Sequence, residues 1–185
     1  MPAERRPITF AERERLGKNI YKGRNIKNIT QHKLAIEVGT TPKIISEMER
    51  PPRYMLTDVF TIVRIAKAFD TTVRDLLMTP NDTFLEDRKP SSLRRKHQDD
   101  DSEPYSKRNA IPESDKLRLA KNIFYHRDLL DLFQGEFSKL INISQQMLSN
   151  FETAKMIPSV FICLRIAELC ETTVEDLCFK NHDNE

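Results

Sequence analysis

The sequence predicts an all-α protein made of two similar helical domains. Three observations lead to this prediction: a repeated sequence, apolar residues at helical spacing, and capping residues placed before the apolar runs. Residues 16–20 (Leu-Gly-Lys-Asn-Ile) recur 103 positions later as residues 119–123 (Leu-Ala-Lys-Asn-Ile). With that offset, and a shortening of two residues before Val59, similar residues align over about sixty positions. Agreement over that length indicates an internal duplication.

Capping residues and apolar spacing predict five helices in the first copy. Thr9 and Glu12 have the form of a capping box, and Gly39 is placed to end the second helix. The expected helices run from Thr9 to about Gly23, over 31–38, from Thr41 to about Arg50, over 59–69, and from Thr72 through Leu77. Thr30 is the expected cap of the second helix.

The second copy follows the same plan, with two changes around its second helix. Ser114, Ser144 and Thr173 stand at helix starts, but Phe133 replaces the capping Thr30. Asn142 replaces the turn glycine, which is tolerated because asparagine can adopt a left-handed conformation.

The charge is distributed unevenly along the chain. The 185 residues carry a net charge of +2, but residues 1–80 hold 15 basic and 9 acidic residues and residues 114–185 hold 8 and 11. The first half therefore has the sign expected of a nucleic-acid binder, and the second does not. Since no apolar run approaches about 20 residues and the N-terminus lacks a signal-like stretch, we expect a cytoplasmic protein with no membrane partner.

The composition between the copies predicts a flexible linker. Residues 80–113 hold a basic run at 94–96 and an acidic run at 99–101, with few apolar residues. The predicted organisation is therefore a first domain at 1–79, the linker at 80–113 and a second domain at 114–185.

Enzymatic activity is not expected, and neither is a cofactor. The sequence has no phosphate-binding glycine loop, metal-ligand spacing or nucleophile motif. Cys163, Cys170 and Cys178 replace apolar residues of the first copy, so we expect them in the core rather than in a metal or redox site.

The second and third expected helices of each copy carry a recognisable pattern. In the first copy it consists of Gln31, Leu34, Ala35, Val38, Gly39, Thr41, Pro42, Ile45, Ser46, Met48 and Glu49. In the second it consists of Gln134, Phe137, Ile141, Ser144, Leu148, Ser149, Phe151 and Glu152. With the closing helices, this pattern resembles the helix-turn-helix of the Cro and phage-repressor family (lambda-repressor-like, XRE type). The resemblance covers about residues 15–77 and 118–178 and implies that fold in both copies.

The resemblance also implies which residues meet DNA. In the family, bases are contacted from the start of the recognition helix and from one position about a turn later. Those positions hold Pro42, which offers no polar group, and the candidate base-contacting residues Lys43, Glu47, Gln145, Gln146 and Asn150. Glutamine and asparagine suit adenine, because a single side-chain amide can form hydrogen bonds with both N6 and N7 of the base. The implied phosphate contacts are Gln31, Thr41, Arg50, Arg53, Gln134, Ser144 and Lys155, and the implied structural ion pairs are Arg24–Glu49 and Arg127–Glu152.

The expected function is sequence-specific binding of double-stranded DNA by a transcriptional regulator acting as a repressor. A linker of this length spans about 30–35 Å, which compares with about 34 Å between successive major-groove faces. Two heads on one chain could therefore act as a tethered pseudo-dimer. The acidic second domain keeps alternatives open: a degenerate helix-turn-helix used for contact with a second copy or a regulatory protein, or an antitoxin-type autoregulator.

Overall fold

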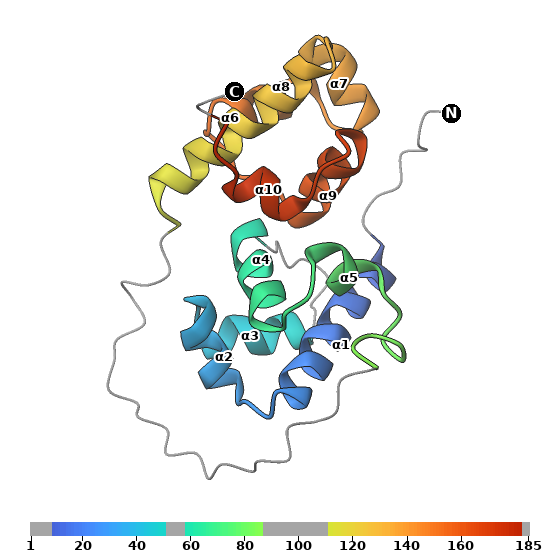
Figure 1. Cartoon of the computed structure of the whole chain (residues 1–185), viewed down its shortest axis with the longest axis vertical. Helices are drawn as coiled ribbons and strands as arrows, with labels where there is room; N and C mark the ends of the chain where they lie inside the picture. The colour runs from blue at the N-terminus through green and yellow to red at the C-terminus, as the bar shows by residue number, and fades with distance from the viewer. Residues whose placement is uncertain (1–8, 51–57, 87–110, 183–185) are drawn as a thin grey trace. The chain divides into compact units, whose positions relative to one another are not determined.

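The chain folds into α-helices in the computed structural model, which describes residues 9–50, 58–86 and 111–182 (Figure 1). The predicted all-α class is confirmed, since these residues form ten helices and no β-strand. The helices of the first half are α1 (Phe10–Ile26), α2 (Gln31–Val38), α3 (Pro42–Glu49), α4 (Val59–Ala68) and α5 (Val73–Met78).

The second half repeats this order of helices. Its helices are α6 (Glu113–Leu129), α7 (Gln134–Leu140), α8 (Gln145–Glu152), α9 (Val160–Leu169) and α10 (Val174–Phe179). Each matches its counterpart in length to within one residue, from the 17-residue α1 and α6 to the 6-residue α5 and α10.

The described residues group into two compact units. The first unit holds residues 9–50 and 63–86, and the second holds residues 58–62 and 111–182. The division therefore falls inside α4.

Most helices begin where the capping residues predicted. At six of the predicted caps the hydroxyl accepts a hydrogen bond from a backbone N–H of the first turn: Thr9, Thr30, Thr41, Thr72, Ser144 and Thr173. The expected start at Ser114 is wrong by two positions, because Pro112 occupies the N-cap of α6 and Glu113 begins the helix. Phe133 lies at the N-cap of α7, where its backbone N–H is bonded by the Glu136 carboxylate at 3.0 Å.

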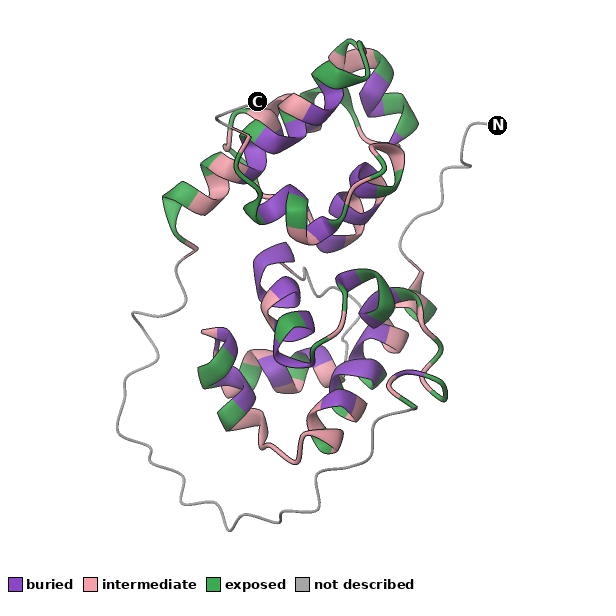
Figure 2. Ribbon diagram, viewed as in Figure 1, coloured by how far each residue is buried: buried purple, intermediate pink, exposed green. Residues whose placement is uncertain are grey.

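Each unit buries the apolar faces of its helices around its own core (Figure 2). In the first unit, fully buried side chains include Ile20, Leu34, Ile45, Ile65, Phe69, Leu76 and Leu77. In the second, they include Ile123, Phe137, Leu148, Phe151, Ile166, Leu177 and Cys178. These residues occupy the apolar positions of the repeated pattern, so the same spacing builds both cores.

The packed part of the first unit continues beyond α5. Residues 81–86 form turns, and Phe84 is buried. The Nζ of Lys22 donates to the carbonyl oxygens of Asn81 and Asp82 at 2.9 and 2.8 Å, which fastens this segment to α1. The first residues of the segment assigned to the linker therefore belong to the first unit's packing, while residues 87–110 lie outside the described parts of the chain.

The three cysteines are free thiols, and two lie in the core of the second unit. Cys163 and Cys178 are buried, and burial raises the pKa of both thiols well above the ordinary value. Burial also raises the pKa of the half-buried Cys170, to about 11. All three stay protonated near neutral pH, as expected of thiols that pack as small apolar groups.

Candidate nucleic-acid interface

Each unit contains two helices joined by the same tight turn. Gly39, at φ 70°, and Asn142, at φ 59°, both adopt the left-handed conformation at the turn. The next residue closes each turn with a backbone hydrogen bond to the residue five positions earlier, from Thr40 to Ala35 at 2.8 Å and from Ile143 to Ser138 at 2.9 Å. These turns set the direction in which α3 leaves α2 and α8 leaves α7.

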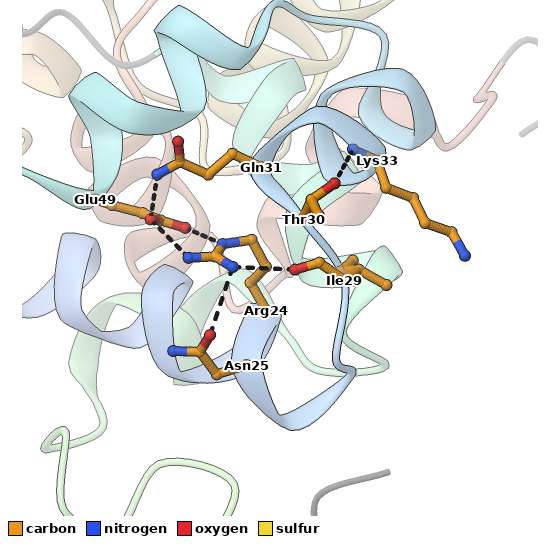
Figure 3. A network of polar contacts seen from close by, with 7 residues as sticks. All are labelled: Arg24, Asn25, Ile29, Thr30, Gln31, Lys33 and Glu49. Atoms are coloured by element: carbon orange, nitrogen blue, oxygen red, sulfur yellow. Dashed lines mark hydrogen bonds and ion pairs between the residues drawn. The ribbon is translucent and has the colours of Figure 1, made fainter. Parts of the chain in front are cut away.

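Three polar side chains, Arg24, Gln31 and Glu49, bond one another at the C-terminal end of α3 in the first unit, and we call this group the clamp (Figure 3). The Nε of Arg24 on α1 lies 2.6 Å from Glu49 Oε1 on α3, and Arg24 Nη2 lies 3.1 Å from Glu49 Oε2. The amide of Gln31, at the start of α2, donates to the same Glu49 Oε2 at 2.7 Å. Only 12% of the Arg24 side chain and 3% of the Glu49 side chain are exposed, so the charges are well shielded from water.

The second unit has the same clamp. Arg127 Nε lies 2.6 Å from Glu152 Oε1, and the Gln134 amide donates to Glu152 Oε2 at 2.7 Å. Arg127 Nη1 also donates to the carbonyl oxygen of Leu132 at 2.7 Å, as Arg24 Nη1 does to that of Ile29 at 3.0 Å. The structure therefore brings together both ion pairs expected from the sequence and adds a glutamine to each.

The two recognition-helix candidates, α3 and α8, bury one face and expose the other. Ile45 and Met48 of α3 are buried, as are Leu148 and Phe151 of α8. The candidate base-contacting side chains lie on the remaining surface: Lys43, Glu47, Gln145 and Gln146 are exposed, and Asn150 is partly exposed. Because the apolar stripe of each helix packs into the core, the predicted base-contacting positions face solvent.

On both helices, two of these residues contact each other one turn apart. Gln146 Nε2 donates to Asn150 Oδ1 at 3.2 Å, and Asn150 Nδ2 lies 3.6 Å from the sulfur of Met156. At the equivalent positions of α3, Lys43 Nζ lies 4.0 Å from Glu47 Oε1. The second unit therefore presents a neutral amide pair where the first presents a solvent-exposed ion pair.

The candidate phosphate-contacting residues lie in three different environments. Thr41 and Ser144 cap α3 and α8, where each hydroxyl accepts a backbone N–H of its own helix. Arg50, at the C-cap of α3, and Lys155, in the segment after α8, are exposed. Gln31 and Gln134 use their side-chain amides within the clamps, and Arg53 lies outside the described residues.

Two kinds of contact in the structure were not anticipated from the sequence. Asn19 and Asn122 are buried, and each donates to carbonyl oxygens at the end of its unit's last helix, Leu76 and Thr79 in one case and Leu177 and Lys180 in the other. Asparagine stands at this position in both copies, and that repetition was the sequence signal that could have indicated a structural role. The repeated pattern gave no such signal for the contact between Met156 and Asn150.

Within the described parts of the chain, no group of three or more His, Cys, Asp or Glu side chains is arranged to hold a metal ion. The helices described here also include none that is long and apolar enough to span a membrane.

Several solved structures are similar to parts of this chain. The P22 c2 repressor, in complex with a synthetic operator, is 17% identical, and the match covers 34% of this chain and 96% of that one with a TM-score of 0.33. The restriction-modification controller protein C.AhdI from Aeromonas hydrophila is 25% identical over 36% of this chain and 98% of its own, also at 0.33. A hypothetical transcription factor, NHTF from Neisseria, is 27% identical over 43% and 87%, with a TM-score of 0.33.

No curated protein sequence matches the chain significantly. The helix-turn-helix family model matches residues 124–177, which begin within α6, end within α10 and include the whole of α7, the turn and α8. The second half of the chain therefore contains a helix-turn-helix domain.

Proposed function

We propose that this protein is a transcriptional regulator, acting as a repressor, that binds a specific sequence of double-stranded DNA through two helix-turn-helix heads. The observation that carries the proposal is the outward face of α8, the second helix of a helix-turn-helix domain. Gln145, Gln146 and Asn150 share that face, while the opposite face is buried. A single α-helix fits the major groove, so such a face can meet base edges directly.

The chemistry of the α8 face suits adenine. A glutamine or asparagine amide can accept from N6 and donate to N7 of one adenine, and each good pair contributes about 1–3 kcal/mol of discrimination against the wrong base. The hydrogen bond from Gln146 to Asn150 orients both amides before DNA arrives. Preorganised side chains lose less rotamer entropy on binding.

The first head is suited more to electrostatic attraction than to base discrimination. Lys43 is 84% exposed at its side chain and can contact guanine or a phosphate, and Glu47 can accept from cytosine. The first half of the chain also holds most of the net positive charge. We therefore assign the larger share of phosphate attraction to the first head and the larger share of sequence discrimination to the second.

Phosphate contacts are proposed at both heads. Arg50 and Lys155 follow their recognition helices and are exposed, so a charged group can reach the DNA backbone from each. Thr41 and Ser144, at the N-termini of α3 and α8, are placed where backbone N–H groups favour anions. Gln31 and Gln134 each donate one amide N–H to their glutamate, which leaves the second N–H to donate to a phosphate. The start of α2 adds its own attraction for an anion, since its first turn holds no acidic residue.

We propose that the first unit is a second copy of the helix-turn-helix domain and that both heads bind one operator. The recurrence of the clamp and of the turn at a constant separation of 103 residues supports this. Tethering two heads raises the effective concentration of the second to about the millimolar range once the first is bound. One chain can then occupy two unequal half-sites without forming a dimer. We propose no enzymatic activity.

Selection of bound fragments from random duplex DNA, by the full chain at two salt concentrations, tests the proposal. A selected consensus with adenine in one half-site, enriched at the higher salt as well, is the expected result, because phosphate attraction falls steeply with salt and base contacts do not. Selected fragments that remain random in sequence at both salt concentrations would contradict sequence-specific binding of DNA.

Two full-chain variants test the tethered arrangement. One carries alanine at Gln145, Gln146 and Asn150, and the other carries alanine at Lys43 and Arg50. Both are expected to bind the selected site more weakly than the wild type by at least about tenfold, since each removes one arm of a bivalent contact. If the variant altered at Lys43 and Arg50 binds the full site as tightly as the wild type, the first head takes no part.

A further inference from the structure

The two units differ in charge and in exposed apolar residues at the corner between their first and second helices. We define the α6–α7 corner as residues 128–136 and the α1–α2 corner as the equivalent residues 25–33. The α6–α7 corner carries Asp128, Asp131 and Glu136 and no basic residue, while the α1–α2 corner carries two lysines and no acidic residue. The same place in the fold is thus negative in one unit and positive in the other.

The α6–α7 corner also exposes large apolar side chains. Phe133 is 81% exposed, Leu129 64% and Leu130 40%. The equivalent residues of the α1–α2 corner are Thr30, Ile26 and Lys27, none of which is fully exposed. Single exposed apolar residues are ordinary, but three within five consecutive positions form a patch of the kind found where proteins bind partners.

A fourth exposed apolar side chain packs against the arginine that is bonded to this corner. Arg127 donates to the carbonyl oxygen of Leu132 within the corner, and its guanidinium carbon lies 5.0 Å from the centre of the Phe124 ring. Phe124 is 49% exposed. Because Arg127 is also clamped to Glu152, the corner is held in a fixed shape, and a fixed surface loses little conformational entropy on binding.

The start of α7 favours a phosphate less than the start of α2 does. The Glu136 carboxylate accepts the Phe133 backbone N–H at 3.0 Å, so a negative group already occupies the positive end of this helix. At the start of α2, the neutral Thr30 hydroxyl caps the helix, and no acidic residue lies in the first turn. An anion is therefore less favoured at the α6–α7 corner than at the α1–α2 corner.

We propose that the α6–α7 corner is a docking surface for a segment of another protein that carries lysine or arginine next to a large apolar side chain. The apolar centre and charged rim have the composition of a protein interface. The acidic rim calls for a basic partner. A two-fold contact of the corner with itself would bring two sets of three carboxylates together, so a second copy of the chain is disfavoured as the occupant.

The test uses the full chain and a display library of random peptides as the probe. The matched variant is Leu130→Lys, Phe133→Thr and Glu136→Lys, which places at the α6–α7 corner the residues that the first unit carries in the same turn. Phe133→Thr alone is the milder second variant, because threonine caps α2 at this position. Circular dichroism and thermal unfolding are the controls that must show both variants to be folded.

The expected result is enrichment of peptides that combine basic and large apolar residues. Synthesised singly, these peptides should bind the triple variant at least about tenfold more weakly, as expected when a central aromatic contact is removed. Their affinity should also fall between about 50 and 300 mM salt, because the rim charges become screened. Leu140→Gln, an exposed apolar position on α7 outside the corner, should leave their affinity unchanged.

Three outcomes would overturn the proposal. The first is that no peptide is enriched over the uncoated matrix. The second is that the enriched peptides are acidic, or bind the wild type, the triple variant and Phe133→Thr alike. The third is sedimentation showing that the wild type self-associates through this corner and the triple variant does not, which would make a second copy the occupant.

Discussion

Arg127 and Glu152 form a two-point ion pair that joins α6 to the end of α8. Nε and Oε1 lie 2.6 Å apart, and Nη2 and Oε2 lie 3.2 Å apart. Arg24 and Glu49 make the same pair in the first unit, across the same separation of 25 residues. Both pairs are largely buried, so they are expected to fix the positions of α3 and α8.

Breaking this pair on one side should destabilise the second unit strongly. Glu152→Gln or Arg127→Met is expected to cost about 3–5 kcal/mol in the free energy of unfolding, because one charge is left stranded in a poorly solvated place. Urea unfolding of the full chain, followed by circular dichroism, measures this.

Replacing both partners is the control for the stranded charge. The double variant Arg127→Met with Glu152→Met should lose less than either single change, since two apolar side chains can fill the space. If both single changes cost less than about 1 kcal/mol, the pair behaves as an exposed salt bridge and the architectural role is wrong.

Gly23 and Gly135 should respond in opposite ways to alanine. A Cβ at Gly23 would lie 2.6 Å from Cδ2 of Phe69, a buried ring, whereas one at Gly135 would meet only Gln145 Oε1 at 3.5 Å. Gly23→Ala should therefore destabilise the first unit by about 1–3 kcal/mol. Gly135→Ala should be neutral or stabilising by up to about 1 kcal/mol, because alanine favours helix. Similar losses in thermal unfolding for the two variants would be inconsistent with this packing.

Acid should weaken the second unit through His126. Burial lowers the pKa of His126 below its ordinary value of 6.5, with His182 and Lys180 lowering it further and Asp176 opposing them. Its Nε2 is buried and finds no hydrogen-bond partner among the described residues. The unfolded chain therefore takes up a proton more readily than the folded unit. The contribution of neutral His126 to the free energy of unfolding is fully present above pH 6.5 and is lost as the pH falls through the lowered pKa.

The measurement is thermal unfolding of the full chain at about pH 7.5 and about pH 5.5. His126→Leu removes the titrating ring, so its melting temperature should fall less between the two values than that of the wild type. An equal fall in both proteins would assign the acid sensitivity to other groups.

Phosphate-contacting and base-contacting residues should differ in how salt and sequence affect them. Arg50→Ala and Lys155→Ala are each expected to weaken binding to selected and scrambled duplexes alike and to reduce the salt slope by about one. Lys18→Ala, on the exposed part of α1, is the matched loss of charge and should leave the slope unchanged. An unaltered slope for Arg50→Ala and Lys155→Ala would remove both from the interface.

The helices and their order could be predicted because the evidence for them is local. Caps such as Thr41 and Ser144 and the apolar spacing lie within a few residues of the structure that they specify. The partners of Gln31 and Gln134 could not be predicted in this way, because each bonds a glutamate 18 residues away whose approach depends on packing. Phe84 was assigned to the linker because it lies in a stretch with few apolar residues, yet it is buried in the first unit.

The most direct test of the central claim compares two duplexes at about 150 mM salt: the site obtained by selection and a scrambled sequence. The full chain should prefer the selected site by at least about a thousandfold. With alanine at Gln145, Gln146 and Asn150, most of that preference should disappear while affinity for the scrambled duplex persists. A wild-type chain that binds both duplexes equally, or a variant that keeps the full preference, would contradict base recognition by α8.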